Sequence, residues 1–212
     1  MEKEIKWTLE RLFNCVVENM ASSPKTMAID ILETAEANLL NSILKIRPED
    51  VYKQAHPECN NIMWIIGHCA SHFHMVLCST SQKQEIISED TAHYFRYGTT
   101  KKEISESKAP MTFAELVDVY LKISTSGFSY LQSLNDVDFE KVIFPEYGET
   151  LLQSIQRVSL HFMGHMGQIV LLRRILGNPG PTFVGGIQTS SRKKMKKEWE
   201  KWWIDNKENF KI

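Results

Sequence analysis

Residues 158–177 read VSLHFMGHMGQIVLLRRILG and place two histidines in a run that is otherwise mostly apolar. His161 and His165 are four residues apart, so in a helix they share one face. The apolar residues recur every three or four positions, which predicts a helix, and His165 occupies a place in their stripe. A buried imidazole needs partners for both ring nitrogens. Two inward-facing imidazoles therefore indicate either hydrogen-bonded packing or part of a metal site.

A second pair of histidines, His68 and His72, lies in the apolar segment NNIMWIIGHCASHFH. The helical period puts His68 on the inward stripe, with His72 one turn further along. Burying several imidazoles is costly, because each unpaired polar group costs on the order of 1–3 kcal/mol, and a divalent metal satisfies them together. On spacing alone, the metal and packing interpretations remain equally open. A zincin-type protease is disfavoured, because Phe162 stands where the glutamate of an HExxH motif would be.

Four helices with apolar stripes must position these side chains. Their predicted ranges are roughly 25–46, 61–79, 112–134 and 151–176. The last two begin with capping boxes, in which Thr112 pairs with Glu115 and Thr150 with Gln153. The long connection 80–111 predicts a crossover that lets the second and third helices run parallel. The predicted fold class is therefore all-α: a four-helix bundle with a long crossover between helices 2 and 3.

One extra helix is predicted at each terminus, over 3–20 and 190–209, and we treat 1–212 as a single domain. The C-terminal helix combines a basic face with three tryptophans, a combination also found in helices that contact membranes or nucleic acid. We favour packing on the bundle or on a second subunit, because tryptophan suits buried contacts.

The composition is that of an ordinary soluble protein, with 212 residues, 42% of them hydrophobic, 24% charged, and a net charge of −1. This balance gives no long-range attraction to nucleic acid or anionic membranes. We see no signal peptide and no apolar run near the ~18 residues of a membrane span, so we expect a cytoplasmic protein. The four cysteines form no CxxC pair and are expected to be free thiols. We expect a small-molecule substrate, no nucleic-acid or membrane partner, and a homodimer.

The two histidine segments resemble the DinB/YfiT-like superfamily, a damage-inducible family of four-helix bundles that includes metalloenzymes. The resemblance covers about 26–178 and rests on two motifs: N-x-x-W-x-x-x-H in the second helix and H-x-x-x-H-x-G-Q-[IL]-x-x-L-R-R-x-x-G in the fourth. The matching residues are Asn61, Trp64, His68, His161, His165, Gly167, Gln168, Arg173, Arg174 and Gly177.

The resemblance implies a metal site made of His68, His161 and His165, with zinc or nickel as the metal. Related proteins include thiol S-transferases that use bacillithiol or mycothiol, and a mycothiol-dependent maleylpyruvate isomerase. A low-molecular-weight thiol is therefore expected as a co-substrate. His72 stands where relatives often carry an acidic or other polar residue, so we expect it to be an outer contact of the metal site or a fourth ligand.

Three protein nitrogens would leave coordination positions open, which is the pattern of catalytic zinc sites. The metal charge would lower the pKa of a bound thiol or water molecule. The leading hypothesis is a metal-dependent thiol S-transferase. Two alternatives stay open: a hydrolase that uses metal-bound hydroxide, and a non-catalytic bundle that binds metal or a partner.

Four further residues are candidates for substrate binding. Gln168 and Arg173 continue the histidine face of the last bundle helix. Arg173 could hold a substrate carboxylate or make a salt bridge at the bundle end. In the crossover segment HYFRYG, Tyr94 and Tyr97 could contact substrate. Together with Phe95 they could instead anchor the crossover, which we favour slightly.

Overall fold

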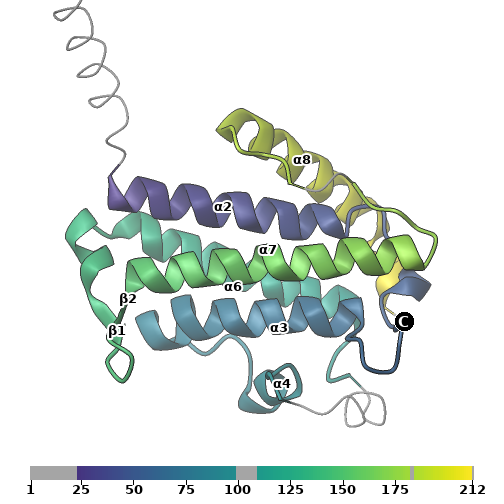
Figure 1. Ribbon diagram of the computed structural model, residues 1–212, viewed down its shortest axis with the longest axis horizontal. Coiled ribbons are helices and arrows are strands. Elements are labelled where there is room, and N and C mark those ends of the chain that lie inside the picture. Colours follow the sequence, from purple (N-terminus) through teal and green to yellow (C-terminus); the bar gives the residue numbers. More distant parts are fainter. Residues whose placement is uncertain (1–22, 99–108, 182–183, 212) are drawn as a thin grey trace, which may run out of the picture.

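The computed structural model describes residues 23–98, 109–181 and 184–211, so the predicted helix at 3–20 lies outside the described residues. Four long helices form a bundle, which confirms the predicted all-α fold class (Figure 1). Their bounds are α2 Pro24–Ser42, α3 Ile62–His74, α6 Phe113–Ser133 and α7 Leu151–Ile175.

Side-chain caps define where these helices begin. The Asn61 side chain accepts a hydrogen bond from the Trp64 amide and caps α3. Both predicted capping boxes are formed, with Thr112 opening α6 and Thr150 opening α7. Each cap satisfies amide groups that have no partner inside the helix. The local sequence thus sets the start, and therefore the register, of the helices that carry the histidines.

The crossover joins parallel helices, as predicted. The Phe73 ring contacts Tyr120, while Cys78, later in the chain, lies near the later residue Ile123. Later residues on one side of this interface contact later residues on the other, so α3 with its extension runs parallel to α6. Figure 1 shows α2 and α7 running in the opposite direction to α3 and α6. Helix α3 packs against both α6 and α7, so it meets the His161 face of α7 in antiparallel orientation.

The bundle core follows the predicted stripes. In α7 the predicted inward-facing residues recur every three or four positions from Leu151 to Leu176. They are buried, except His165 and Leu176, which are half-buried. The segment Ile62–Thr80 corrects the expectation that no apolar run approaches the length of a membrane span, because it is the one stretch among the described residues that is long and apolar enough to cross a membrane. It is 72% buried inside the bundle, as expected for a central helix of a soluble core.

The second helix reaches its predicted end because a π-helical segment, Met75–Thr80, extends α3. The crossover itself contains a short helix that was not predicted, α4, Glu89–Tyr94. Phe95 follows α4 and is 1% exposed. Its ring lies against Gly67 of α3 so closely that a Cβ atom there would be 2.2 Å from the ring. A glycine in α3 therefore makes the space in which the crossover docks.

A hairpin between α6 and α7 was also not predicted. Its strands, β1 Val142–Phe144 and β2 Glu149–Thr150, are antiparallel and lead directly into α7. They are short and carry no clear alternation of apolar residues, which is why no strand was predicted there. The hairpin places Glu149 beside the first turns of α7.

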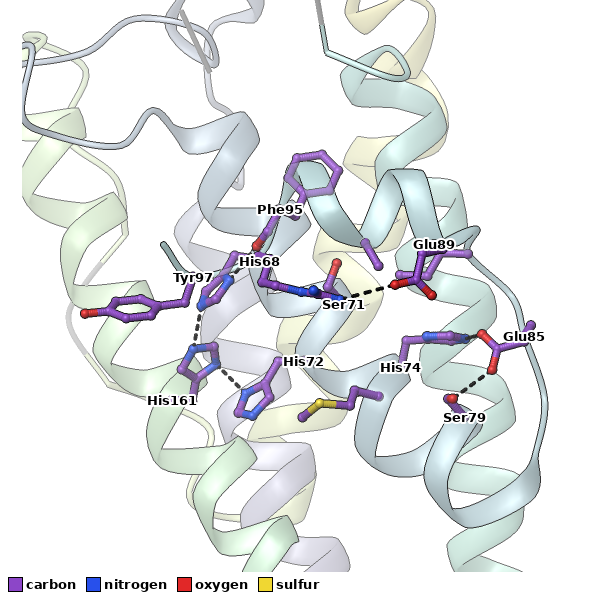
Figure 2. Close-up of a pocket in the computed structure, with 14 residues that line it drawn as sticks. His68, Ser71, His72, His74, Ser79, Glu85, Glu89, Phe95, Tyr97 and His161 are labelled. Atoms are coloured by element: carbon purple, nitrogen blue, oxygen red, sulfur yellow. Dashed lines mark hydrogen bonds and ion pairs between the residues drawn. The ribbon is translucent and has the colours of Figure 1, made fainter. Parts of the chain in front are cut away.

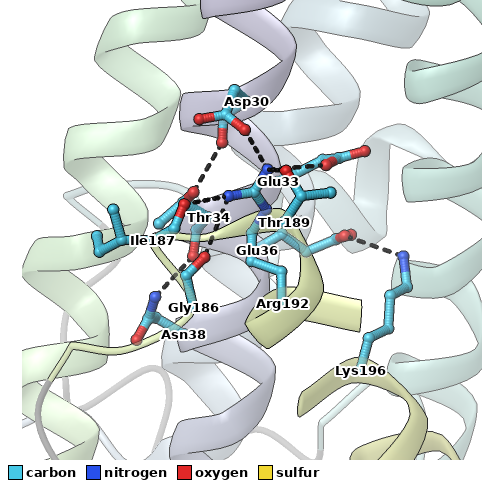
Figure 3. A network of polar contacts seen from close by, with 10 residues as sticks. All are labelled: Asp30, Glu33, Thr34, Glu36, Asn38, Gly186, Ile187, Thr189, Arg192 and Lys196. Atoms are coloured by element: carbon cyan, nitrogen blue, oxygen red, sulfur yellow. Dashed lines mark hydrogen bonds and ion pairs between the residues drawn. The ribbon is translucent and has the colours of Figure 1, made fainter. Parts of the chain in front are cut away.

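The C-terminal helix α8, Thr189–Asn206, packs along α2 (Figure 1). Trp199 and Trp203 are buried, as the packing interpretation expects. The basic face is partly used in the same contact, because buried Arg192 pairs with Asp30 of α2 (Figure 3). The helix is thus held to the bundle by both apolar and charged contacts.

Buried Glu36 of α2 lies beneath this helix. Its carboxylate accepts a hydrogen bond from Ser124 of α6 and pairs with Lys196 of α8 at 3.4 Å. Burial raises the pKa of Glu36, while Lys196 and Ser124 act in the opposite direction. A lysine from α8 therefore compensates a carboxylate in the bundle interior.

We expect Gly67→Ala to destabilise the protein, because its Cβ would overlap the Phe95 ring. Overpacking of this kind costs about 1–3 kcal/mol. Gly164→Ala is the matched control in α7, since nothing lies within 4 Å of its Cβ position and alanine favours a helix by about 1 kcal/mol. Denaturant unfolding measures both effects. Equal unfolding free energies for the two variants would contradict this packing.

Candidate metal centre

Three histidine nitrogens converge between α3 and α7. The Nε2 atom of His161 is 3.1 Å from the Nε2 atoms of both His68 and His165. All three ligand atoms lie within 4.8 Å of one another. In a tetrahedral site with zinc–nitrogen bonds of about 2.0–2.1 Å, such atoms would be about 3.3 Å apart. The two 3.1 Å distances are close to this value, so the spacing is compatible with a single shared metal ion.

The outer nitrogens of two of these rings have oxygen partners. Nδ1 of His68 lies 2.7 Å from the carbonyl oxygen of Phe95, and Nδ1 of His165 lies 2.8 Å from Oε1 of Gln168. An oxygen acceptor requires the proton on Nδ1, which leaves the Nε2 lone pair facing the shared centre. This arrangement is characteristic of metal-binding histidines. The donor set fits a divalent ion such as zinc or nickel.

His72 lies behind His161 and outside the group of three. Its Nδ1 atom is 2.9 Å from Nδ1 of His161, on the side of that ring away from the shared centre (Figure 2). In this geometry His72 is an outer contact of His161. A fourth imidazole therefore does not close the centre.

The imidazoles are held in their neutral form. Burial, followed by the repulsion of neighbouring histidines, lowers the pKa of His161 to about 2. Burial and the charge of Arg157 lower the pKa of His72 to about 4. Burial is also the main cause of the lowered pKa values of His68 and His165. Neutral rings keep the lone pairs that a metal ion needs.

The DinB superfamily matches residues 31–169 of this chain. The chain belongs to the DinB superfamily. No curated protein and no solved structure matches it significantly. The matched range contains His68, His161 and His165, so the converging histidines lie within the DinB region. The family and the histidine geometry are together compatible with a metal-binding protein.

Sequence reasoning missed an arginine–glutamate pair beside the centre. Arg157 lies one turn before His161, and its Nη1 atom makes a short contact with Nε2 of His72. Glu149 of the hairpin holds the same guanidinium, at 2.8 Å from Nε and 3.2 Å from Nη2. The four-residue spacing from Arg157 to His161 was the available signal. The glutamate lies on an irregular segment and left no pattern.

Arg173 does not lie beside the converging histidines of this DinB protein. It is 1% exposed, and its guanidinium donates to backbone carbonyl oxygens of Ser42, Leu44 and Asn178. These contacts close the C-terminal end of α2 and differ from both expected roles, a substrate clamp and a salt bridge. We therefore leave Arg173 out of the proposed substrate site.

The crossover residues differ in their placement. Phe95 is the buried anchor, while Tyr94 is half-buried and its carbonyl accepts from the Trp64 indole at 3.2 Å. Tyr97 is 87% exposed and lines a cavity. The anchoring interpretation thus suits Phe95, whereas Tyr97 remains available for a ligand.

A cavity of about 530 Å³ opens beside the histidines (Figure 2). It lies between α3 and the crossover, and its floor includes His68, His72 and His161. The apolar part of its wall is formed by Met75, Ile87, Ala92 and Phe95. Small-molecule sites typically have volumes of about 300–1,000 Å³. The cavity is therefore large enough to hold a small organic molecule next to the shared centre.

Alanine substitution of each of the three converging histidines is expected to weaken metal binding strongly. Each variant removes one of the Nε2 atoms at the shared centre. Elemental analysis after dialysis against zinc or nickel measures the effect, with His56→Ala, an exposed loop histidine, as the control. Metal content that is equal in His161→Ala and His56→Ala would contradict the site.

The metal-free protein is expected to lose stability as the pH falls from about 7 toward 4. Histidines in the unfolded chain titrate near pH 6.5, whereas the folded pKa values are about 2 for His161 and about 4 for His72. Above pH ~6.5 the lowered pKa values of these two histidines therefore cost the protein no stability. Below that pH, stability falls by up to ~1.4 kcal/mol per pH unit for each extra proton bound by the unfolded chain.

Chemical unfolding at a series of pH values, with chelator present, measures this slope. A double variant, His72→Gln with His161→Gln, is expected to show a flatter dependence because both depressed groups are gone. The same slope in the wild type and the double variant would show that these histidines do not cause the acid sensitivity.

Proposed function

We propose that this DinB protein is a divalent-metal-dependent enzyme of the thiol S-transferase type. The observation that carries the proposal is the convergence of three neutral imidazoles on one side of a cavity. Sites with three protein ligands keep a position for water or substrate, whereas structural zinc sites usually have four. The geometry therefore favours catalysis over a purely structural metal.

Zinc or nickel bound by His68, His161 and His165 would lower the pKa of a thiol at the open position, which supplies a nucleophile near neutral pH. The protein's own contribution is to orient the rings. Trp64 stacks on His68 with the ring centroids 4.6 Å apart, and the Phe95 carbonyl fixes the rotation of the same ring. Gln168 fixes His165 in a similar way. These two rings therefore need little reorganisation when a metal binds.

The cavity wall supports an organic electrophile as the second substrate. The apolar side chains Met75, Ile87 and Phe95 can hold its carbon skeleton near the histidines, while exposed Tyr97 lies at the rim. Positioning an electrophile close to a thiol replaces an encounter in solution with reaction inside one complex, which accelerates the reaction. A low-molecular-weight thiol is the co-substrate in this proposal.

The direct test measures turnover by zinc-loaded and nickel-loaded protein. Chlorodinitrobenzene and a small epoxide serve as electrophiles, with cysteine, glutathione, bacillithiol and mycothiol as thiols. We expect thiol-dependent product formation that His161→Ala abolishes. Thiol-independent cleavage of esters or amides would instead identify a hydrolase. Metal binding without turnover in either assay would favour a non-catalytic protein.

Blocking the cavity is expected to slow turnover without removing the metal. Ala92 lines the cavity from α4, and Ala92→Trp would fill it. Loss of substrate positioning predicts a rate decrease of about tenfold or more. Asp90→Trp is the matched control, because Asp90 is exposed on the same helix and lies outside the cavity lining. Equal rates for the two variants, at equal metal content, would show that substrate binds elsewhere.

A further inference from the structure

A row of polar contacts connects the hairpin to the metal centre. Glu149 binds the Arg157 guanidinium through two oxygens, and Arg157 contacts Nε2 of His72. Nδ1 of His72 then lies 2.9 Å from Nδ1 of His161, whose Nε2 atom faces the other two histidines. Each contact constrains the next, because both nitrogens of His72 and Nδ1 of His161 each have one partner in the row.

The arginine determines where the protons lie. A guanidinium only donates hydrogen bonds, so Nε2 of His72 must accept. A neutral imidazole carries one proton, which for His72 is then on Nδ1 and is donated to Nδ1 of His161. His161 consequently carries its own proton on Nε2, directed at the shared centre. In this arrangement every hydrogen-bond donor in the row faces an acceptor. Nε2 of His161 carries a proton, however, so it has no lone pair to offer a metal ion.

Metal binding requires the opposite arrangement in these two rings. A metal ion needs the Nε2 lone pair of His161, so the proton of that ring must lie on Nδ1. Nδ1 of His72 must then accept, and the His72 proton moves to Nε2. No proton is gained or lost. However, the N–H group at Nε2 of His72 now faces the N–H groups of Arg157, and two donors cannot form a hydrogen bond. The Arg157–His72 contact and a metal-loaded centre are therefore incompatible.

We propose that Arg157 is a positioning residue that opposes metal loading, by holding His72 and His161 in the arrangement that does not bind metal. The inference rests on the three-histidine site of the proposed function. When metal binds, Arg157 leaves His72 and remains held by Glu149. Its bonds to Glu149 use Nε and Nη2, and its guanidinium carbon lies 5.7 Å from the centre of the Phe144 ring, so these two partners can retain the side chain when Nη1 leaves His72. The positive charge of Arg157 acts in the same direction, since it disfavours a nearby dication.

The test compares metal affinities, which do not depend on turnover. Arg157→Gln removes the obligatory donor, because the glutamine amide can also accept a hydrogen bond from His72. We expect cobalt and zinc to bind about tenfold or more tightly to this variant, as a charge-assisted hydrogen bond no longer opposes loading. Competition with a chromophoric chelator measures both affinities. Arg174→Gln is the matched control: it removes the same charge from an exposed position of α7, about 25 Å further along.

A second pair of variants separates the hydrogen bond from the charge. In a His72→Phe background, Arg157→Gln is expected to change cobalt affinity little, because the connection to His161 is already broken. An equal increase in both backgrounds would mean that Arg157 acts through its charge alone and would overturn the tautomer mechanism. Affinity that is unchanged or weaker in Arg157→Gln would overturn the whole inference.

Ring nitrogen chemical shifts in the wild type provide a measurement without any variant. Zinc addition is expected to move the His72 proton from Nδ1 to Nε2, which NMR of the labelled imidazoles detects directly. An unchanged His72 tautomer in the zinc-loaded protein would contradict the inference while leaving the metal site intact. Failure of both the wild type and Arg157→Gln to bind either metal would overturn the site itself, and the proposed function with it.

Discussion

The need to satisfy several half-buried imidazoles governs the interface between α3 and α7. A ring nitrogen removed from water must find a partner, and here the partners are supplied from three directions. The crossover offers the Phe95 carbonyl and α7 offers Gln168. The hairpin contributes through Glu149, which holds Arg157 of α7 against His72. The remaining Nε2 atoms meet one another. The elements around this interface are therefore arranged to orient imidazoles as well as to bury apolar surface.

Phe95 links the packing of the fold to the chemistry of the site. Its ring docks against Gly67, while its carbonyl oxygen orients His68. Phe95 thus anchors the crossover and also sets the tautomer of His68, the residue that follows Gly67. The cavity is bounded by the same crossover. Changes in crossover packing would consequently alter both the orientation of His68 and the shape of the cavity where a substrate would bind.

The sequence allowed prediction of the features that repeat along the chain. Apolar stripes and capping boxes located the four helices. The spacing of the histidines indicated inward-facing imidazoles, and the family resemblance implied that His68, His161 and His165 form one group. Features that depend on contacts between distant segments were not predictable. Helix α4 and the hairpin are too short to show a period, and the partnership of Arg157 with Glu149 depends on how the hairpin folds back. Arg173 matched a family motif, but burial directs it to backbone carbonyls.

The buried carboxylate of Glu36 has a consequence for where this protein's domain ends. The DinB match stops at residue 169, yet the cation that pairs with Glu36 comes from Lys196 of α8. The other side chain that bonds this carboxylate is Ser124 of α6. In this chain α8 therefore supplies a charged partner that the matched range does not contain. The C-terminal helix thus forms part of the interior of the bundle as well as covering it.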